Sequence, residues 1–241
     1  QPSSEDIFLD FETDSLVRNP THRTSIVEAN FERQFHKGMA GQSARFLLRD
    51  HRLALKLPLY LHLAGGTLTR EVGDFSFACE FSPDASNGTI LQRENFVSAK
   101  QYLFSIRLTK GRVEATFTNL LAKTPLDQKP ELKNATLKSI DKVQLKKRNH
   151  LSLTYSEAKG VLTLTLNGRE QDTFTLQRES GANYVLNFEN LAEAPYVLFP
   201  SYRGYADNIL FTNRIFSPEE ILDYGKLNPY GDKYEQRKGI F

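Results

Sequence analysis

The feature that most constrains the fold is a run of alternating segments that starts at Leu151. Apolar side chains occupy every second position in LSLTY and VLTLTL, and Asn167-Gly168 separates the second segment from REQDTFTL. A period of two places the apolar side chains on one face of a strand, and Asn-Gly is a strong hairpin signal because both residues accept a positive φ. We therefore expect a three-stranded antiparallel meander.

The same alternation recurs through most of the chain. Residues 102–120 predict a hairpin with its turn at Lys110-Gly111. Short strands with regular turn signals are typical of β-sandwiches and barrels. The remaining expected strands are Asp74–Phe81, Tyr184–Phe188, Tyr196–Phe199 and Asn208–Phe211, with shorter ones at Ile7–Phe11 and Ser43–Leu48.

Three segments have other patterns. Ser217-Pro218-Glu219-Glu220 has the spacing of a capping box and predicts a short helix that ends near Gly225. Ser25–Phe35 fits a helix and a strand equally well, and residues 121–142 fit either an excursion between strands or an edge hairpin. We expect one domain over residues 1–225, followed by a tail over residues 226–241.

The C-terminal third carries a resemblance to a known family. In the run from Ser201 to Ile221, Gly204 precedes a strand that opens on Asp207, and a short capped helix follows. This order resembles the closing signature of laminin G-like, concanavalin A-like domains, and the segments LTLTLNG, GQSARF and DFSF resemble earlier strands of that family. The resemblance implies an all-β jelly-roll sandwich of two antiparallel sheets. That fold serves lectins, glycosidases, adhesion modules and structural proteins alike.

Composition excludes several classes of function. The chain has 31 Lys and Arg against 29 Asp and Glu, a net charge of +2 that is spread along the sequence. We therefore expect no single-sign field that would recruit nucleic acid or anionic lipid. No apolar run approaches the roughly 18 residues that span a bilayer, so membrane insertion is not expected. The single cysteine, Cys79, excludes an internal disulfide framework and alternates with phenylalanines, which predicts a core position.

The sequence offers no support for catalysis. It lacks Gly-x-Ser-x-Gly, and its five histidines, at positions 22, 36, 51, 62 and 150, show no metal-binding spacing. Glucanases on this fold carry carboxylates at alternate strand positions, and the closest match is Asp10, Glu12 and Asp14. We interpret those three as a solvated strand end, because the chain has no Trp to hold sugar rings.

Two kinds of binding residue remain candidates. The family resemblance implies calcium, for which Asp84, Asn87 and Asp207 have the right residue types. A plain surface turn and a structural hydrogen bond are the alternatives. A glycan platform would use Tyr196, Tyr202, Arg203 and Tyr205, although ordinary core and rim tyrosines explain these residues equally well. Lys146-Lys147-Arg148 is interpreted as a solvated edge that discourages strand pairing.

The ends of the chain suggest a compartment and an assembly role. The chain starts at Gln1 and its single methionine is Met39, so we expect removal of an export signal and a periplasmic or secreted protein. A chain shortened for expression is the alternative. In the tail, Tyr230, Tyr234, Ile240 and Phe241 would dock either on a neighbouring subunit or on the domain itself.

Two functions follow from these observations. The first is a non-catalytic structural or binding subunit of an extracytoplasmic assembly, with protein subunits as partners; sheath proteins of spirochaete periplasmic flagellar filaments are one such group. The alternative is a lectin-like carbohydrate-binding module with a glycan as its partner. A glycosidase is the least favoured.

Overall fold

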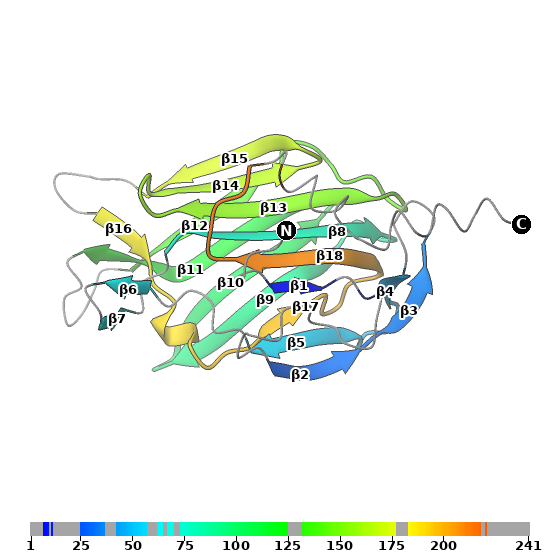
Figure 1. Cartoon of the computed structure of the whole chain (residues 1–241), viewed down its shortest axis with the longest axis horizontal. Helices are drawn as coiled ribbons and strands as arrows, with labels where there is room; N and C mark the ends of the chain where they lie inside the picture. Colours follow the sequence, from blue (N-terminus) through cyan, green and yellow to red (C-terminus); the bar gives the residue numbers. More distant parts are fainter. Residues whose placement is uncertain are drawn as a thin grey trace, which may run out of the picture.

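The computed structural model consists of two β-sheets packed face to face (Figure 1). It describes residues 7–9, 11, 25–36, 42–56, 62–64, 67–69, 73–124, 132–176, 183–217 and 220. Within these residues one short 3-10 helix, η1 (Glu189–Leu191), follows the sixteenth strand. The strands are β1 (Ile7–Leu9), β2 (Ser25–Asn30), β3 (Glu32–Phe35), β4 (Gln42–Phe46), β5 (Arg52–Lys56), β6 (His62–Ala64), β7 (Thr67–Thr69), β8 (Phe75–Pro83), β9 (Gly88–Val97), β10 (Lys100–Thr109), β11 (Arg112–Thr124), β12 (Leu132–Lys138), β13 (Asn149–Ser156), β14 (Val161–Leu166), β15 (Arg169–Thr175), β16 (Asn183–Leu186), β17 (Tyr196–Leu198) and β18 (Gly204–Thr212).

Both large sheets are antiparallel and are built by crossovers between distant parts of the chain. Sheet A has the order β15-β14-β13-β8-β18-β4-β3, and β1 also pairs with β18. Sheet B has the order β12-β11-β10-β9-β17-β5-β2, and β16 also pairs with β11. The strands β6 and β7 form a separate two-stranded sheet. The predicted jelly-roll sandwich is confirmed.

The two hairpin predictions are confirmed, together with their turn chemistry. Strands β13, β14 and β15 form the meander, and β10 pairs with β11. Asn167 and Gly168 have φ of 52° and 76°, and Lys110 and Gly111 have φ of 52° and 79°. Positive φ at both central residues is the geometry that lets a two-residue turn follow the twist of its strands.

The two segments for which the sequence allowed two alternatives contain strands. Ser25–Phe35 forms β2 and β3, which end sheet B and sheet A respectively, so this run passes from one sheet to the other. Residues 132–138 form β12 beside β11, which matches the edge-hairpin alternative. The strands β5 and β9 were not predicted.

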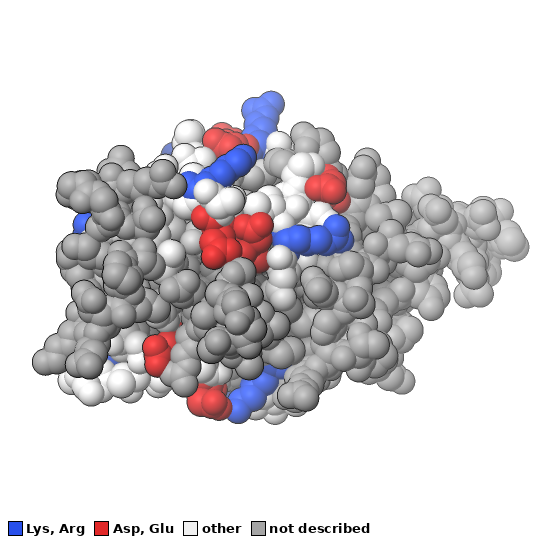
Figure 2. Space-filling model, turned by 60° about the vertical axis from the view of Figure 1, so that its left-hand side comes forward, with Lys and Arg blue, Asp and Glu red and all other residues white. Residues whose placement is uncertain are grey.

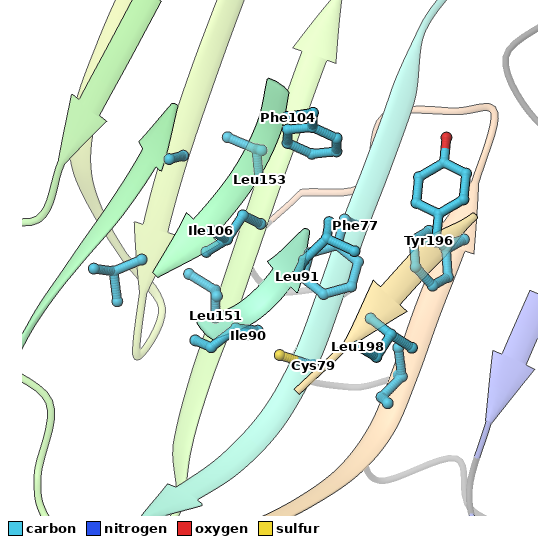
Figure 3. Packing of buried hydrophobic residues seen from close by; sticks show 14 of the residues in the cluster. Phe77, Cys79, Ile90, Leu91, Phe104, Ile106, Leu151, Leu153, Tyr196 and Leu198 are labelled. Atoms are coloured by element: carbon cyan, nitrogen blue, oxygen red, sulfur yellow. The ribbon is translucent and has the colours of Figure 1, made fainter. Parts of the chain in front are cut away.

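The core lies between the two sheets. Figure 3 shows Phe77 and Cys79 of sheet A facing side chains of sheet B such as Phe104 and Leu198. The predicted core position of Cys79 is confirmed, since its side chain is 2% exposed and burial raises the pKa of its thiol. Aromatic contacts tighten the packing, and the rings of Phe104 and Phe117 stack with centroids 4.8 Å apart.

Gly204 fixes the start of β18, and a capping box follows the end of this strand. At Gly204, φ is 144° and an added Cβ would lie 2.3 Å from the Ser82 carbonyl oxygen, so only glycine fits. The Ser217 amide donates to Glu220 Oε2 (2.8 Å), and the Glu220 amide donates to Ser217 Oγ (3.2 Å), as the capping box predicts. Most of the expected helix and the whole tail over residues 226–241 lie outside the described residues.

Candidate binding site

Two of the four predicted glycan contacts are core residues. The side chains of Tyr196 and Tyr202 are 0% and 1% exposed. The Tyr196 hydroxyl accepts a hydrogen bond from Arg93 Nη1 (3.0 Å), whose guanidinium carbon lies 4.3 Å from the ring centroid. Burial raises the pKa of Tyr196 to about 12, although the charge of Arg93 opposes the shift. Neither ring presents a face to solvent, so the glycan prediction is corrected for both.

The other two predicted contacts, Arg203 and Tyr205, lie at the start of β18. Arg203 is exposed, and Tyr205 is half-buried. The ring of Tyr205 already contacts two cationic or polar groups: its centroid lies 4.1 Å from the Arg45 guanidinium carbon and 4.4 Å from the His36 ring centroid. The Tyr205 hydroxyl donates to Gln34 Oε1 (3.3 Å). We name Gln34, His36, Arg45, Asp84 and Tyr205 the rim cluster.

The rim cluster is held together by its own contacts. Arg45 Nη2 pairs with Asp84 Oδ2 at 2.9 Å, and His36 Nε2 lies 3.2 Å from Ser82 Oγ. Burial and the charge of Arg45 lower the pKa of His36, while Asp84 partly opposes this shift. A neutral imidazole packs against the tyrosine without adding a second positive charge beside Arg45. The cluster therefore ties β3, β4 and β18 to the turn after β8.

The three predicted calcium ligands do not form one set of donors. The carboxylate of Asp84 is paired with Arg45, and Asn87 Oδ1 accepts a hydrogen bond from the Lys110 amide (2.9 Å). Asp207 is fully buried within sheet A, where it lies opposite Glu80 in the strand pairing. In the described residues, no three His, Cys, Asp or Glu side chains are grouped as metal ligands. The donor set does not fit calcium, and we derive no role for the ion.

A buried ionic cluster occupies the outer face of sheet A. Glu80 is 1% exposed, and its Oε1 lies 2.5 Å from Arg148 Nη2 and 3.1 Å from His150 Nε2. Burial raises the pKa of Glu80, but the hydrogen bond and charge of His150 and the charge of Arg148 outweigh it, so the net shift is downward. The cluster joins β8 to β13, and the loss of one partner would leave a buried charge uncompensated.

Several predicted residues lie outside the described part of the chain. These are the alternating carboxylates Asp10, Glu12 and Asp14 and the tail residues Tyr230, Tyr234, Ile240 and Phe241. Their roles stay predictions.

A row of polar side chains along β9 and β10 is the candidate site that the sequence analysis missed. The row lies on the outer face of sheet B. In β10, Gln101 and Arg107 alternate with the core residues Tyr102, Phe104 and Ile106, and Phe96 of β9 lies directly opposite Gln101, with Glu94 and Gln92 at alternate positions before it. Arg107 Nη2 donates to Gln92 Oε1 (3.2 Å), and Gln92 Nε2 donates to Glu94 Oε2 (2.8 Å). Gln101 Nε2 donates to Glu94 Oε1. Each side chain is held by the next.

An exposed aromatic ring continues this row. Phe96 pairs with Gln101 across the two strands, follows Glu94 on the same face, and is 65% exposed. We name Gln92, Glu94, Phe96, Gln101 and Arg107 the β9–β10 strip. Its polar members are partly or fully exposed. Carboxylate oxygens have two acceptor sites each and a guanidinium has five N–H donors, so the strip keeps unused hydrogen-bonding capacity.

The comparisons with known proteins show the fold. No protein-family model matches the chain, and no curated protein matches it in sequence. Among solved structures, the binding domain of botulinum neurotoxin serotype D is 10% identical with a TM-score of 0.62, covering 92% of this chain and 51% of that chain. The binding domain of Paraclostridial mosquitocidal protein 1 is 11% identical with a TM-score of 0.56 over 92% and 51%.

A sialidase shares the same sandwich. The Trypanosoma rangeli sialidase in complex with the inhibitor DANA is 13% identical with a TM-score of 0.56, and the match covers 92% of this chain and 32% of that chain. The chain thus spans about half of the two binding domains and a third of the sialidase. At these identities the shared property is the β-sandwich. None of the three is named as a flagellar or sheath protein, so the sheath role stays a prediction.

Proposed function

We propose that the protein is a non-catalytic carbohydrate-binding module and that the β9–β10 strip contacts the glycan. This is the lectin-like alternative of the sequence analysis, moved from the rim of the sandwich to the outer face of sheet B. The observation that carries it is the continuous row of mutually oriented amide, carboxylate and guanidinium groups that ends in the exposed ring of Phe96.

The chemistry of the strip suits a sugar. Hydroxyl groups need donors and acceptors in fixed positions, and the C–H faces of a sugar ring pack on an aromatic ring. Because the side chains of the strip already hold one another, little rotamer entropy is lost when a ligand binds. The rim cluster is also held by its own contacts, but its tyrosine ring already contacts Arg45 and His36, whereas the ring of Phe96 is 65% exposed.

The strip also indicates the class of glycan. It contains one cation, Arg107, and one carboxylate, Glu94. Balanced charge gives no preference for an acidic sugar, so the expected ligand is neutral. From Gln92 to Phe96 strand β9 advances about 13 Å, which is longer than one sugar ring and favours an extended oligosaccharide.

Names of the structural neighbours agree with a binding role. Two of them are described as binding domains, although the third is a sialidase. The shared fold alone does not transfer a ligand, and so the proposal depends on the strip.

The test is a glycan array followed by calorimetric titration of a neutral oligosaccharide that binds. Phe96→Ala should weaken affinity about tenfold, because it removes the stacking surface. Phe35→Ala is the matched control, since Phe35 is 56% exposed on β3 of the other sheet. It should bind like the wild type.

Two results would overturn the proposal. The first is a wild-type protein that binds no glycan on the array. The second is an equal loss of affinity in Phe35→Ala and Phe96→Ala, which would mean that the strip is not the contact surface.

A further inference from the structure

Four loops meet at one end of the sandwich and are joined by backbone hydrogen bonds. The end is the one where β8 finishes and β13 and β18 begin, at the right in Figure 1. The Gly111 amide donates to the Ser86 carbonyl (2.7 Å), and the Val143 amide donates to the Gly111 carbonyl (2.8 Å). The Lys146 amide donates to the Pro83 carbonyl (2.8 Å). The Asp84 amide donates to the Arg203 carbonyl (2.9 Å), which completes the set.

These loops bring five exposed cations to a single surface, which we name the basic end. The loop between β12 and β13 contributes three of them, and the β10–β11 turn and the β17–β18 turn contribute one each. None has an ion-pair partner among the described residues. The five are Lys110, Lys142, Lys146, Lys147 and Arg203.

Few acidic side chains oppose them. Asp84 is already paired with Arg45, so Asp141 is the acidic side chain of the β12–β13 loop that remains; its exposed carboxylate accepts a hydrogen bond from the neutral amide of Gln171 (3.0 Å) and keeps its charge. Figure 2 shows a different distribution on another face, where Lys and Arg lie beside Asp and Glu. The net charge of +2 is small, but the fold gathers cations from distant parts of the chain at this end.

The same surface exposes two aliphatic side chains. In the loop between β12 and β13, Val143 enters the core, while Ile140 is 71% exposed and Leu145 is 46% exposed. They lie on either side of Val143 in the sequence and beside the lysines of the loop. A soluble polyanion would gain little from aliphatic groups, whereas a lipid interface binds cations at its headgroups and aliphatic groups beneath them.

We propose that the basic end is a docking surface for an anionic lipid bilayer. The five cations face the negatively charged headgroups, and Ile140 and Leu145 enter the interface between headgroups and acyl chains. Binding of this kind is peripheral and reversible, and it involves no membrane-spanning segment. It goes beyond the glycan proposal, because the β9–β10 strip shares no residue with the basic end.

The test is co-sedimentation of the full chain with two kinds of vesicle: phosphatidylcholine alone, and equal parts of phosphatidylcholine and phosphatidylglycerol. We expect binding to the second kind only, with release at high salt. Lys146→Gln with Lys147→Gln should weaken that binding about thirtyfold. Lys159→Gln removes an exposed lysine from the β13–β14 turn at the far end of β13 and should have little effect.

A second variant distinguishes lipid from a soluble polyanion. Ile140→Ser with Leu145→Ser should weaken vesicle binding and leave retention on heparin unchanged. Three results would overturn the proposal. The wild type could bind both kinds of vesicle equally, or neither kind. Lys159→Gln could weaken binding as much as the double substitution of Lys146 and Lys147 does, or the aliphatic variant could bind anionic vesicles like the wild type. The last result would mean that the contact is purely electrostatic and that the aliphatic side chains do not enter the lipid interface.

Discussion

The outer faces of the two sheets carry similar residues in different surroundings. On sheet A, Glu80 is 1% exposed and contacts Arg148 and His150, whereas on sheet B Glu94 is partly exposed and contacts two glutamine amides. A buried carboxylate must be compensated by opposite charge, because losing its hydration is costly. A partly hydrated carboxylate needs no opposite charge, and neutral hydrogen-bond donors are enough to orient it. The first arrangement compensates a charge that burial would otherwise penalise, and the second leaves groups available for a ligand.

The largest expected effect is on sheet A. Glu80→Gln removes the charge that holds Arg148 and His150 between β8 and β13. We expect the free energy of unfolding to fall by about 3 kcal/mol, at the lower end for a broken buried pair because Arg148 is partly exposed. Urea denaturation measures the change, and glycan affinity should not alter. A loss below about 1 kcal/mol would mean that the ionic cluster contributes little.

Folding stability should also decrease at acidic pH, because of two groups, one on sheet A and one directly after its strand β3. The pKa values of Glu80 and His36 are both lowered in the folded chain, so the unfolded chain takes up protons more readily. Stability should decline first as pH falls below the ordinary range of histidine and then again below that of glutamate. Thermal unfolding across pH measures both steps, and Glu80→Gln should remove the second. A midpoint that does not change with pH would contradict the downward shifts.

A smaller effect is expected at the rim cluster. Arg45→Gln removes the pair with Asp84 and the guanidinium beside the Tyr205 ring. The free energy of unfolding should fall by about 1.5 kcal/mol, with glycan affinity unchanged. Calorimetric titration decides between the two regions. If Arg45→Gln weakens glycan binding as strongly as Phe96→Ala does, the rim cluster is the contact surface.

The smallest expected change in stability lies on sheet B. Gln92→Ala removes the link between Arg107 and Glu94 at a partly exposed position. Unfolding should change by less than about 0.5 kcal/mol, while glycan affinity falls about fivefold because the neighbouring groups lose their fixed orientation. Gln34→Ala, at the rim, is the matched control and should bind like the wild type. The opposite ranking of the two glutamines would contradict the proposed site.

Strand pairing could be predicted where local signals were clear. Asn167-Gly168 and Lys110-Gly111 marked their turns because a glycine accepts the positive φ that such turns need. The turn between β9 and β10 uses Ser98 and Ala99, with φ of 49° and 62°, and neither is one of the Gly, Asn or Asp residues that signal such a hairpin turn. A register shift opposite Ile106 also interrupts the alternation of β9. The strip on this hairpin was therefore missed.

Site residues were harder to predict than strands. Residue type suggested Tyr205 as a glycan contact and Asp84 as a calcium ligand, in two separate sites. It could not show that Arg45, from a distant strand, pairs with Asp84 and packs against Tyr205. Tyr196 and Tyr202 are of the residue type that glycan platforms use, but both side chains are buried. Burial of an aromatic residue depends on which sheet covers it, and this is a property of long-range pairing.

The most direct test of the central claim is amide NMR of the labelled protein during titration with a neutral oligosaccharide that binds. We expect the largest chemical-shift changes on β9 and β10, around Glu94, Phe96 and Gln101. Amides of β3, β4 and the start of β18 should stay unchanged. The largest changes at Arg45 and Tyr205, with β9 and β10 unaffected, would contradict the account and assign binding to the rim cluster.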